Sequence, residues 1–337
     1  MTASSTRPGP TPCAPRSTGA HAPSPTPAAA VPGAPSYHRL TGLTPVLDVR
    51  CAPPRRGGGW LTAADLTDRP EAVRELIAHD ARQGLARYGQ PLRPDVAAGF
   101  GLHRFVWPVS LLFTLPWFLE RRVPLLTPAD VALRRRPDAV ELTVRPTGFA
   151  CLPDDPAAGS PQARTAPDEE ALAAGLRGAL GGFLAPVLAA FGPEARRGPR
   201  VLWAMATDAV VEGLCFAGGL LGEADRARAE LSALLAPGPP GASGAPSTPS
   251  TCGAPGARDA LDALDAPGGR AGDASAPGAV GRPAPAPAPF TPGAGFAPPA
   301  PADGGAPTAD RVRASCCLVY TVERQDMCNG CPRVMRR

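Results

Sequence analysis

Lysine is absent from this chain of 337 residues, so all 34 basic side chains are arginine. Isoleucine and asparagine each occur once, as Ile77 and Asn329. Because the codons of these three amino acids are rich in A and T, the bias is typical of a GC-rich genome and does not indicate selection for arginine chemistry. A net charge of +4 is small for this length, so no nucleic-acid partner is predicted.

The chain also lacks the apolar runs that mark export or insertion into a membrane. Residues 1–35 contain no apolar core followed by a small-residue cleavage site, so no secretory signal is predicted and we expect a cytoplasmic protein. The most apolar run, Phe105 to Leu119, has fifteen residues and includes Pro108 and Pro116. A bilayer span needs about twenty apolar residues. We interpret the run as a buried helical segment, and peripheral contact with a membrane is not expected.

Nucleotide-binding motifs are missing as well. There is no G-x-G-x-x-G following a strand and no P-loop, so bound NAD(P)H or FAD is not predicted. No arrangement of a nucleophile with a general base is evident. Catalytic residues beyond those of a bound cofactor are therefore not predicted.

Proline and glycine are abundant, with 46 and 38 residues, and they divide the chain. Together they make up about a quarter of it, close to the level typical of low-complexity segments. They concentrate at both sides of a region with apolar periodicity. The sequence predicts a disordered N-terminal tail, a helical body with a small β element, a flexible Pro/Ala/Gly-rich linker and a C-terminal cysteine segment: 1–36, 37–236, 237–309 and 310–337.

The predicted fold class is mainly α with a small β-hairpin, an α+β body. An extended segment is predicted between Tyr37 and Trp60, and a hairpin around Gly148. The hairpin would pair 140–145 with 149–152, and a linker would follow over 153–167. The first predicted helix covers 70–88, with Thr67 or Asp68 as its cap and Gly89 at its end. The second covers 94–122 and is kinked or restarted at Pro108 and Pro116. The others are a short helix from Thr127, with Arg134–Arg136 near its end; one from Asp168 that Pro186 ends; 201–221; and 223–235.

Four of the nine cysteines lie within sixteen residues at the C-terminal end, in the pattern C-C-x10-C-x2-C. They are Cys316, Cys317, Cys328 and Cys331. Three occupants fit four clustered sulfurs: a structural zinc ion, a [2Fe–2S] cluster, or a redox dithiol. The other cysteines (Cys13, Cys51, Cys151, Cys215 and Cys252) show no ligand spacing.

The cysteine spacing does not favour the three occupants equally. Cys328 and Cys331 form a knuckle that suits zinc, but the adjacent Cys316 and Cys317 would point to opposite faces of an extended chain, and this favours the larger iron–sulfur cluster modestly. A dithiol of the thioredoxin type needs a βαβ context, which is missing here. The four histidines all lie far upstream, so a Rieske centre has no local ligands: they are His21, His38, His79 and His103.

The sequence Ser315-Cys316-Cys317-Leu318-x-Tyr320 with the following C-x-x-C resembles the ferric siderophore reductases of the FhuF-like family. The body resembles the family in order: Trp60 precedes a helix ending in Arg87-Tyr88-Gly89, a long apolar helix follows, and Leu202-Trp203 opens the late buried helix. The resemblance covers about 60–236 and 311–332.

This resemblance implies a [2Fe–2S] cluster on Cys316, Cys317, Cys328 and Cys331, and a cytoplasmic oxidoreductase that reduces siderophore-bound Fe(III) with one electron for iron acquisition. The electron would come from a separate donor protein such as a ferredoxin. The competing hypothesis is a non-enzymatic, zinc-stabilised interaction module on a helical body.

The aromatic residues of the apolar helices have two interpretations. Trp107, Trp117 and Trp203 could line a siderophore pocket, although large aromatic side chains on apolar helices usually belong to the core. His103 and Arg104, just before the apolar run, are open to the same two interpretations.

Overall fold

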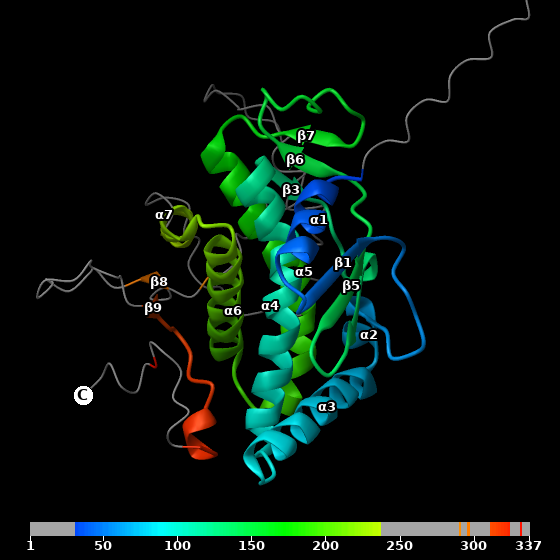
Figure 1. Cartoon of the computed structure of the whole chain (residues 1–337), viewed down its shortest axis with the longest axis vertical. Coiled ribbons are helices and arrows are strands. Elements are labelled where there is room, and N and C mark those ends of the chain that lie inside the picture. The colour runs from blue at the N-terminus through cyan, green and yellow to red at the C-terminus, as the bar shows by residue number, and fades with distance from the viewer. Residues whose placement is uncertain (1–30, 237–289, 291–294, 297–310, 324–330, 332–337) are drawn as a thin grey trace, which may run out of the picture. The chain divides into compact units, whose positions relative to one another are not determined.

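The computed structural model describes residues 31–236, 290, 295–296, 311–323 and 331. Within them the protein is mainly helical with two small mixed sheets and one two-residue strand pair, which confirms the predicted fold class (Figure 1). The helices are α1 (Ala34–Leu43), α2 (Ala63–Asp68), α3 (Pro70–Tyr88), α4 (Pro94–Glu120), α5 (Glu169–Ala195), α6 (Pro199–Leu220) and α7 (Ala224–Leu235), with 3-10 turns η1 (Pro128–Asp130) and η2 (Val319–Thr321).

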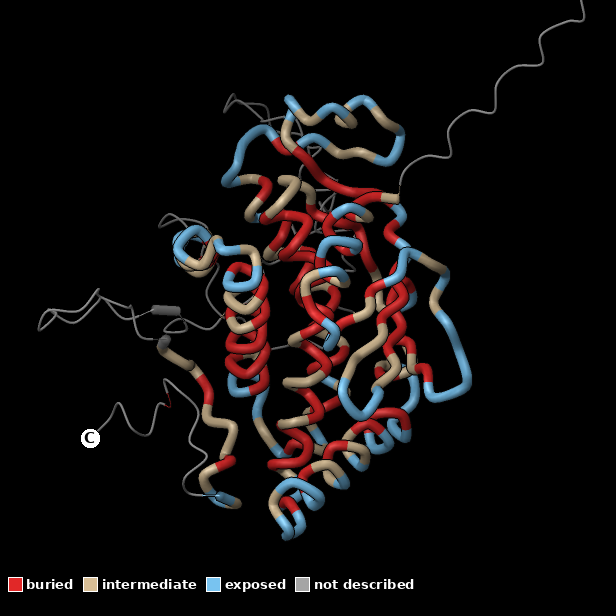
Figure 2. The backbone as a smooth tube through the Cα atoms, in the orientation of Figure 1, coloured by how far each residue is buried: buried red, intermediate tan, exposed pale blue. Residues whose placement is uncertain are grey.

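The helices α4, α5 and α6 form the centre of the body, and α4 contacts both of the others. Phe113 of α4 meets Phe183 of α5 edge to face at 5.4 Å, and Trp107 meets Phe216 of α6 in the same way at 5.1 Å. Buried residues are concentrated along these helices in Figure 2. Their apolar surfaces therefore build the common core, which the sheets and shorter helices extend.

By length and composition alone, α4, α5 and α6 could each cross a membrane, in the part of the chain that the structure describes. Within the protein itself, 78%, 50% and 72% of their most apolar windows are buried. The run from Phe105 to Phe118 is buried against neighbouring elements at almost every position. The interpretation of this run as a buried helical segment is confirmed.

The prolines inside the long helices do not end them, which corrects the predicted end at Pro186 and the predicted restart at Pro108 or Pro116, while a kink at these two prolines stays a prediction. Helix α4 continues through Pro108 and Pro116, and α5 continues through Pro186 and Pro193. A proline inside a helix costs about 3 kcal/mol because it removes one backbone hydrogen bond and crowds the preceding turn. The neighbours of Pro186, such as Leu184 and Val187, are buried in the core. Tertiary burial on both sides of the proline outweighs its local cost.

The two mixed sheets have the strand orders β1-β5-β4-β2 and β3-β6-β7. In the first, β1 pairs with β5 in parallel, while β4 pairs antiparallel with β5 and β2. The strands are β1 (Leu47–Cys51), β2 (Leu61–Thr62), β3 (Arg122–Pro124), β4 (Val131–Arg135), β5 (Val140–Val144), β6 (Phe149–Cys151), β7 (Ala163–Thr165), β8 (Gly295–Phe296) and β9 (Arg311–Val312).

The predicted hairpin around Gly148 is wrong in its pairing, although both of its strands exist. The strand β5 turns back onto β4, and a bond from the Arg136 amide to the Ala139 carbonyl (2.8 Å) closes that turn. The strand β6 pairs instead with β3 and β7, in the other sheet. Alternation identified the strands, but their partners come from elsewhere in the chain, and β7 lies within the predicted linker 153–167.

The short helix predicted from Thr127 is also wrong. Asp130 accepts hydrogen bonds from the amide and hydroxyl of Thr127, and this closes the single 3-10 turn η1. The chain then enters β4, whose first residues Val131 and Leu133 are buried and pair with β5. Strand pairing and burial decide the conformation here, and Arg134 and Arg135 lie at the end of a strand.

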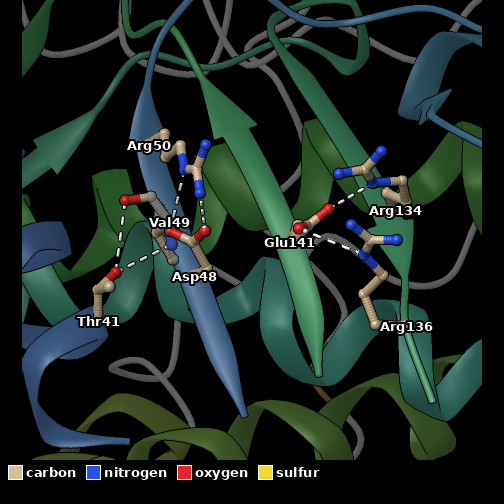
Figure 3. A network of polar contacts seen from close by, with 7 residues as sticks. All are labelled: Thr41, Asp48, Val49, Arg50, Arg134, Arg136 and Glu141. Atoms are coloured by element: carbon tan, nitrogen blue, oxygen red, sulfur yellow. Dashed lines mark hydrogen bonds and ion pairs between the residues drawn. The ribbon is translucent and has the colours of Figure 1, made fainter. Parts of the chain in front are cut away.

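Figure 3 shows the polar surface of this first sheet. Glu141 of β5 accepts from Arg134 and Arg136, and Arg136 Nε lies 3.4 Å from it. These contacts lower the pKa of Glu141, with the hydrogen bond from Arg134 as the largest cause. Thr41 of α1 accepts a hydrogen bond from the Val49 amide of β1 at 2.9 Å. Thr41 thus attaches the sheet to α1 through β1, and the charge pairs of Glu141 lie on β5 and at the end of β4.

A helix, α1, begins at Ala34, where the sequence predicted the end of a disordered tail and then an extended segment. The hydroxyl of Tyr37 donates to the carbonyl of Leu112 (2.7 Å), and the Ser36 amide donates to Glu120 (3.0 Å). Both partners belong to α4, so tertiary contacts hold α1 in place. Strand β1 supplies the extended part of the prediction.

The helix α3 is confirmed, with Gly89 after its last turn at φ 67°, a left-handed conformation that glycine adopts without strain. The predicted cap by Thr67 or Asp68 is wrong, because these residues end a separate helix, α2. A reciprocal capping box between Thr62 and Asp65 begins α2. The helices α6 and α7 are confirmed within two residues of their predicted bounds.

Most of the predicted linker 237–309 and the tail 1–30 lie outside the described residues. Three residues of the linker are described. Phe290 packs against the main core, and Gly295–Phe296 (β8) pairs with Arg311–Val312 (β9). The strand β8 contacts α7, so the residues just before the cysteine segment lie on the helical body.

Candidate iron–sulfur segment and its docking site

The cysteine segment is attached to the body through one buried carboxylate, that of Asp208. The amides of Ala314 and Ser315 donate to Asp208 at 2.9 and 2.8 Å, and the Ser315 hydroxyl donates to it as well. Asp208 lies in the apolar helix α6 and is 1% exposed. A buried carboxylate is costly unless hydrogen bonds satisfy it, and three donors from the residues directly before Cys316 do so here.

A second polar contact lies one helical turn along α6. Arg313 places Nη1 3.4 Å from Glu212 Oε2, and His103 of α4 places Nε2 3.3 Å from the same oxygen. Arg313 Nε also lies 3.9 Å from Asp208. The side chain of Arg313 is only 10% exposed, so α4, α6 and the segment share one partly buried charged contact.

An apolar contact holds the other end of the segment. Leu318 and Val322 pack against the small cluster of Leu92, Val96 and Ala97 where α3 leads into α4. Gln90 donates its side-chain amide to the Val322 carbonyl at 2.7 Å. Residues 313–322 therefore contact the body at both ends, with Cys316 and Cys317 between the two attachments.

The described cysteines of the cluster pattern differ in exposure. Cys316 and Cys317 are half-buried, and Cys331 is 4% exposed. Cys328 lies outside the described residues, as do Cys13 and Cys252. Among the residues that are described, no three His, Cys, Asp or Glu side chains form a group able to hold a metal ion. The structure thus locates three of the four predicted ligands, and these three do not form such a group.

The described cysteines outside the pattern lie on β1, β6 and α6. Cys151 is buried on β6, Cys51 is exposed at the end of β1, and Cys215 is half-buried on α6. Burial raises the pKa of the Cys151 thiol, which lowers its thiolate fraction. The Cys215 side chain packs against the core.

One cavity adjoins the segment, and a second, larger cavity lies next to the first. The smaller, of about 150 Å³, is lined by residues of α4, α6 and the segment, including His103, Glu212, Ser315 and Cys317. The larger, of about 370 Å³, lies between α3, α4 and the turn from β4 to β5. His103 and Glu212 line both cavities, so the two meet at this pair.

Behind the larger cavity lies a buried charge cluster. Asp80 of α3 is fully buried and pairs with Arg104 of α4 at 2.7 Å and with Arg135 of β4. Arg135 also donates to the Gly101 carbonyl at 3.2 Å. Burial lowers the pKa of Arg135, and the charge of Asp80 opposes this effect. The cluster joins three elements and fixes the arginines that line the cavity.

Residues 313–333 match the family model of the FhuF 2Fe-2S C-terminal domain. By this similarity we name residues 313–333 the FhuF-type domain. The match contains all four clustered cysteines, and the cofactor of the FhuF-type domain is a [2Fe–2S] cluster. It does not include residues 60–236, where the resemblance to the family stays a prediction. No curated protein and no solved structure matches the chain.

The cysteines of the FhuF-type domain were found from sequence, but the residues that hold the domain on the body were missed. Asp208 and Glu212 lie four residues apart in an otherwise apolar stretch, and that isolated acidic pair was the available signal. Gln90 gave none. Of the aromatic residues singled out, Trp107 lines the larger cavity, whereas Trp117 is buried and Trp203 packs on the core.

Proposed function

We propose that the protein is a ferric siderophore reductase, which transfers one electron to chelated Fe(III) so that Fe(II) is released. The match of residues 313–333 to the FhuF 2Fe-2S domain carries this proposal. We assign Cys316, Cys317, Cys328 and Cys331 as the cluster ligands, because the four thiols within the matched residues form a complete all-thiolate donor set. When bound, the cluster supplies one electron at low potential.

The rest of the proposed reaction needs little from acid–base chemistry. The oxygen donors of a siderophore bind Fe(III) much more tightly than Fe(II), so one added electron is enough to release the metal. For each Fe(II) formed the protein loses one electron, which a donor protein such as a ferredoxin returns. A separate donor is proposed because the sequence holds no nucleotide-binding motif.

The chain's own residues hold the domain against the body and limit the access of water. Asp208 and the cluster around Leu92 fix residues 314–322, and the burial of Cys331 and Val319 shields part of the segment. We propose that the protein acts in the cytoplasm, where free thiols persist. The thiols of Cys51, Cys151, Cys316 and Cys331 are free, which supports this.

A stoichiometric mixing experiment tests the function. Anaerobic protein is reduced with dithionite, freed of excess reductant and mixed with a ferric siderophore and a colorimetric Fe(II) chelator. We expect about one Fe(II) for each cluster that is reoxidised, because a [2Fe–2S] centre exchanges one electron. Reduced protein that keeps its electron in the presence of a range of ferric siderophores, while its cluster is intact, would exclude the proposed activity.

A further inference from the structure

The smaller cavity lies against the cysteine segment, and the larger one opens next to it on the helical body. Cys317 lines the smaller cavity, and His103 and Glu212 form the boundary with the larger one. This pair of side chains thus separates the larger cavity from the smaller one, which Cys317 lines. Among the described residues, α4 supplies groups to both cavities, since His103 lines both and Trp107 lines the larger.

We propose that the larger cavity binds the iron-bearing part of the ferric chelate. This inference rests on the proposed reductase function and adds to it the location of the substrate. Electron transfer requires the iron to lie close to the cluster ligands without displacing them. The larger cavity suits this requirement because it meets the smaller cavity, which Cys317 lines, while its own lining contains no cysteine.

The size and lining of the cavity suit such a ligand. Its volume of about 370 Å³ lies within the range of about 300–1,000 Å³ that is common for ligand sites. It can hold an iron centre with its ring of donor groups, while the remainder of a siderophore extends through the open side. Trp107 supplies an aromatic wall, Val46 and Val140 supply aliphatic surface, and Gln83 supplies a polar amide.

The charges of the lining are already balanced. Arg104 and Arg135 share Asp80, and Arg136 is paired with Glu141, as Figure 3 shows. Two further carboxylates, Asp138 and Glu212, line the same cavity. The site therefore has no surplus of cations to attract a highly charged anion, so a chelate without net charge is the appropriate probe.

The test uses oxidised full-length protein with its cluster and neutral ferric tris(acetohydroxamate), kept intact by excess free ligand. The oxidised protein has no electron to give, so titration calorimetry reports binding alone. The test variant is Val46→Trp, which places a large ring at the cavity. The control is Val201→Trp on α6, because both valines are 38% exposed and Val201 lines neither cavity.

We expect Val46→Trp to raise the Kd about tenfold or more, while Val201→Trp leaves the Kd close to that of the wild type and both keep the visible cluster spectrum. A second variant, Trp107→Phe, keeps an aromatic wall of smaller area and should weaken binding less than Val46→Trp. Equal Kd values for Val46→Trp and the wild type would overturn the inference.

The outcomes separate the location from the function. If the wild-type protein reduces the chelate and Val46→Trp binds and reduces it equally well, the cavity is wrong and the reductase function stands. If the chelate binds in a Val46-dependent way but reduced protein transfers no electron to it, the cavity stands as a binding site and the proposed function fails. Wild-type protein that neither binds nor reduces the chelate would overturn both.

Discussion

Asp208 is the residue on which the attachment of the FhuF-type domain depends. Its carboxylate accepts three hydrogen bonds from Ala314 and Ser315 inside an apolar helix. Each of these donors would lose its partner if the carboxylate were removed, and a buried unsatisfied donor costs about 1–3 kcal/mol. The energy of this contact is therefore concentrated at one position.

We expect Asp208→Asn to loosen the segment without unfolding the body. An asparagine has one acceptor oxygen and presents an NH₂ group to the remaining donors, so local opening becomes easier. Hydrogen exchange in a peptide covering 313–320 should become about tenfold faster or more, since a change of about 1.4 kcal/mol is a factor of ten. The control is Glu212→Gln, one turn along α6, where the carboxylate is more exposed and a smaller change is expected. Unchanged exchange in Asp208→Asn would show that the segment is held by other contacts.

The ligand assignment predicts which cysteines matter. Serine at Cys316, Cys317, Cys328 or Cys331 should abolish or strongly reduce the visible absorption of the cluster, because each change removes one of four thiolates. Serine at Cys13, Cys252 or the buried Cys151 should leave the spectrum unchanged. The measurement is visible absorption of anaerobically purified variants at equal protein concentration. A spectrum lost in one of the second group, or kept in one of the first, would make the ligand set wrong.

For single residues, sequence reasoning finds local patterns and misses contacts between residues that are far apart in the chain. The cysteine spacing is contained within sixteen residues, so it can be seen in the sequence. Asp208 and Ser315 are separated by 107 positions, and no local rule pairs them. Only the isolated acidic residue in an apolar stretch pointed to a buried partner.

Among the elements, α3, α4 and β4 meet at the fully buried Asp80. Arg135, with a side chain 8% exposed, and Arg104 both depend on this carboxylate for their charge partner. Removing one member of a buried pair leaves an uncompensated charge, which costs about 3–5 kcal/mol. The contact also positions the arginines beside the larger cavity.

We expect Asp80→Asn to lower the free energy of unfolding by about 3 kcal/mol, because Arg135 stays buried without a counter-charge. Urea denaturation followed by circular dichroism measures the change. Asp225→Asn on α7 is the matched control: its carboxylate is 98% exposed and pairs only with a neighbouring turn, so its midpoint should stay at the wild-type value. If both variants unfold at the wild-type midpoint, the charge cluster does not stabilise the fold.

The elements themselves were predicted best where their periodicity was strong. The bounds of α3, α6 and α7 follow from apolar spacing and, for α3, from Gly89. The prediction failed where burial overrides local cost, as at Pro186 in α5, and where a strand finds a distant partner, as β5 does in β4. The helix α1 was missed for the same reason, because its contacts to α4 cannot be seen in a Pro-containing local sequence.

For the whole molecule, the described residues combine a helical body with a domain held on α4 and α6 by polar contacts and on the start of α4 by apolar ones. The body supplies the carboxylate that binds the segment and the cavity beside it. The segment supplies the thiols. Composition predicts neither the cavity nor which groups the body and the segment each supply. The family match gives the cofactor class, which the cysteine spacing favours.

The most direct test of this account is metal and sulfide analysis of anaerobically purified protein together with its visible spectrum. We predict about two irons and two sulfides per chain, no zinc, and a reddish-brown absorption that bleaches with dithionite, as a [2Fe–2S] centre requires. Colourless protein with one zinc ion and no iron would contradict the account and would support a zinc-stabilised interaction module in its place.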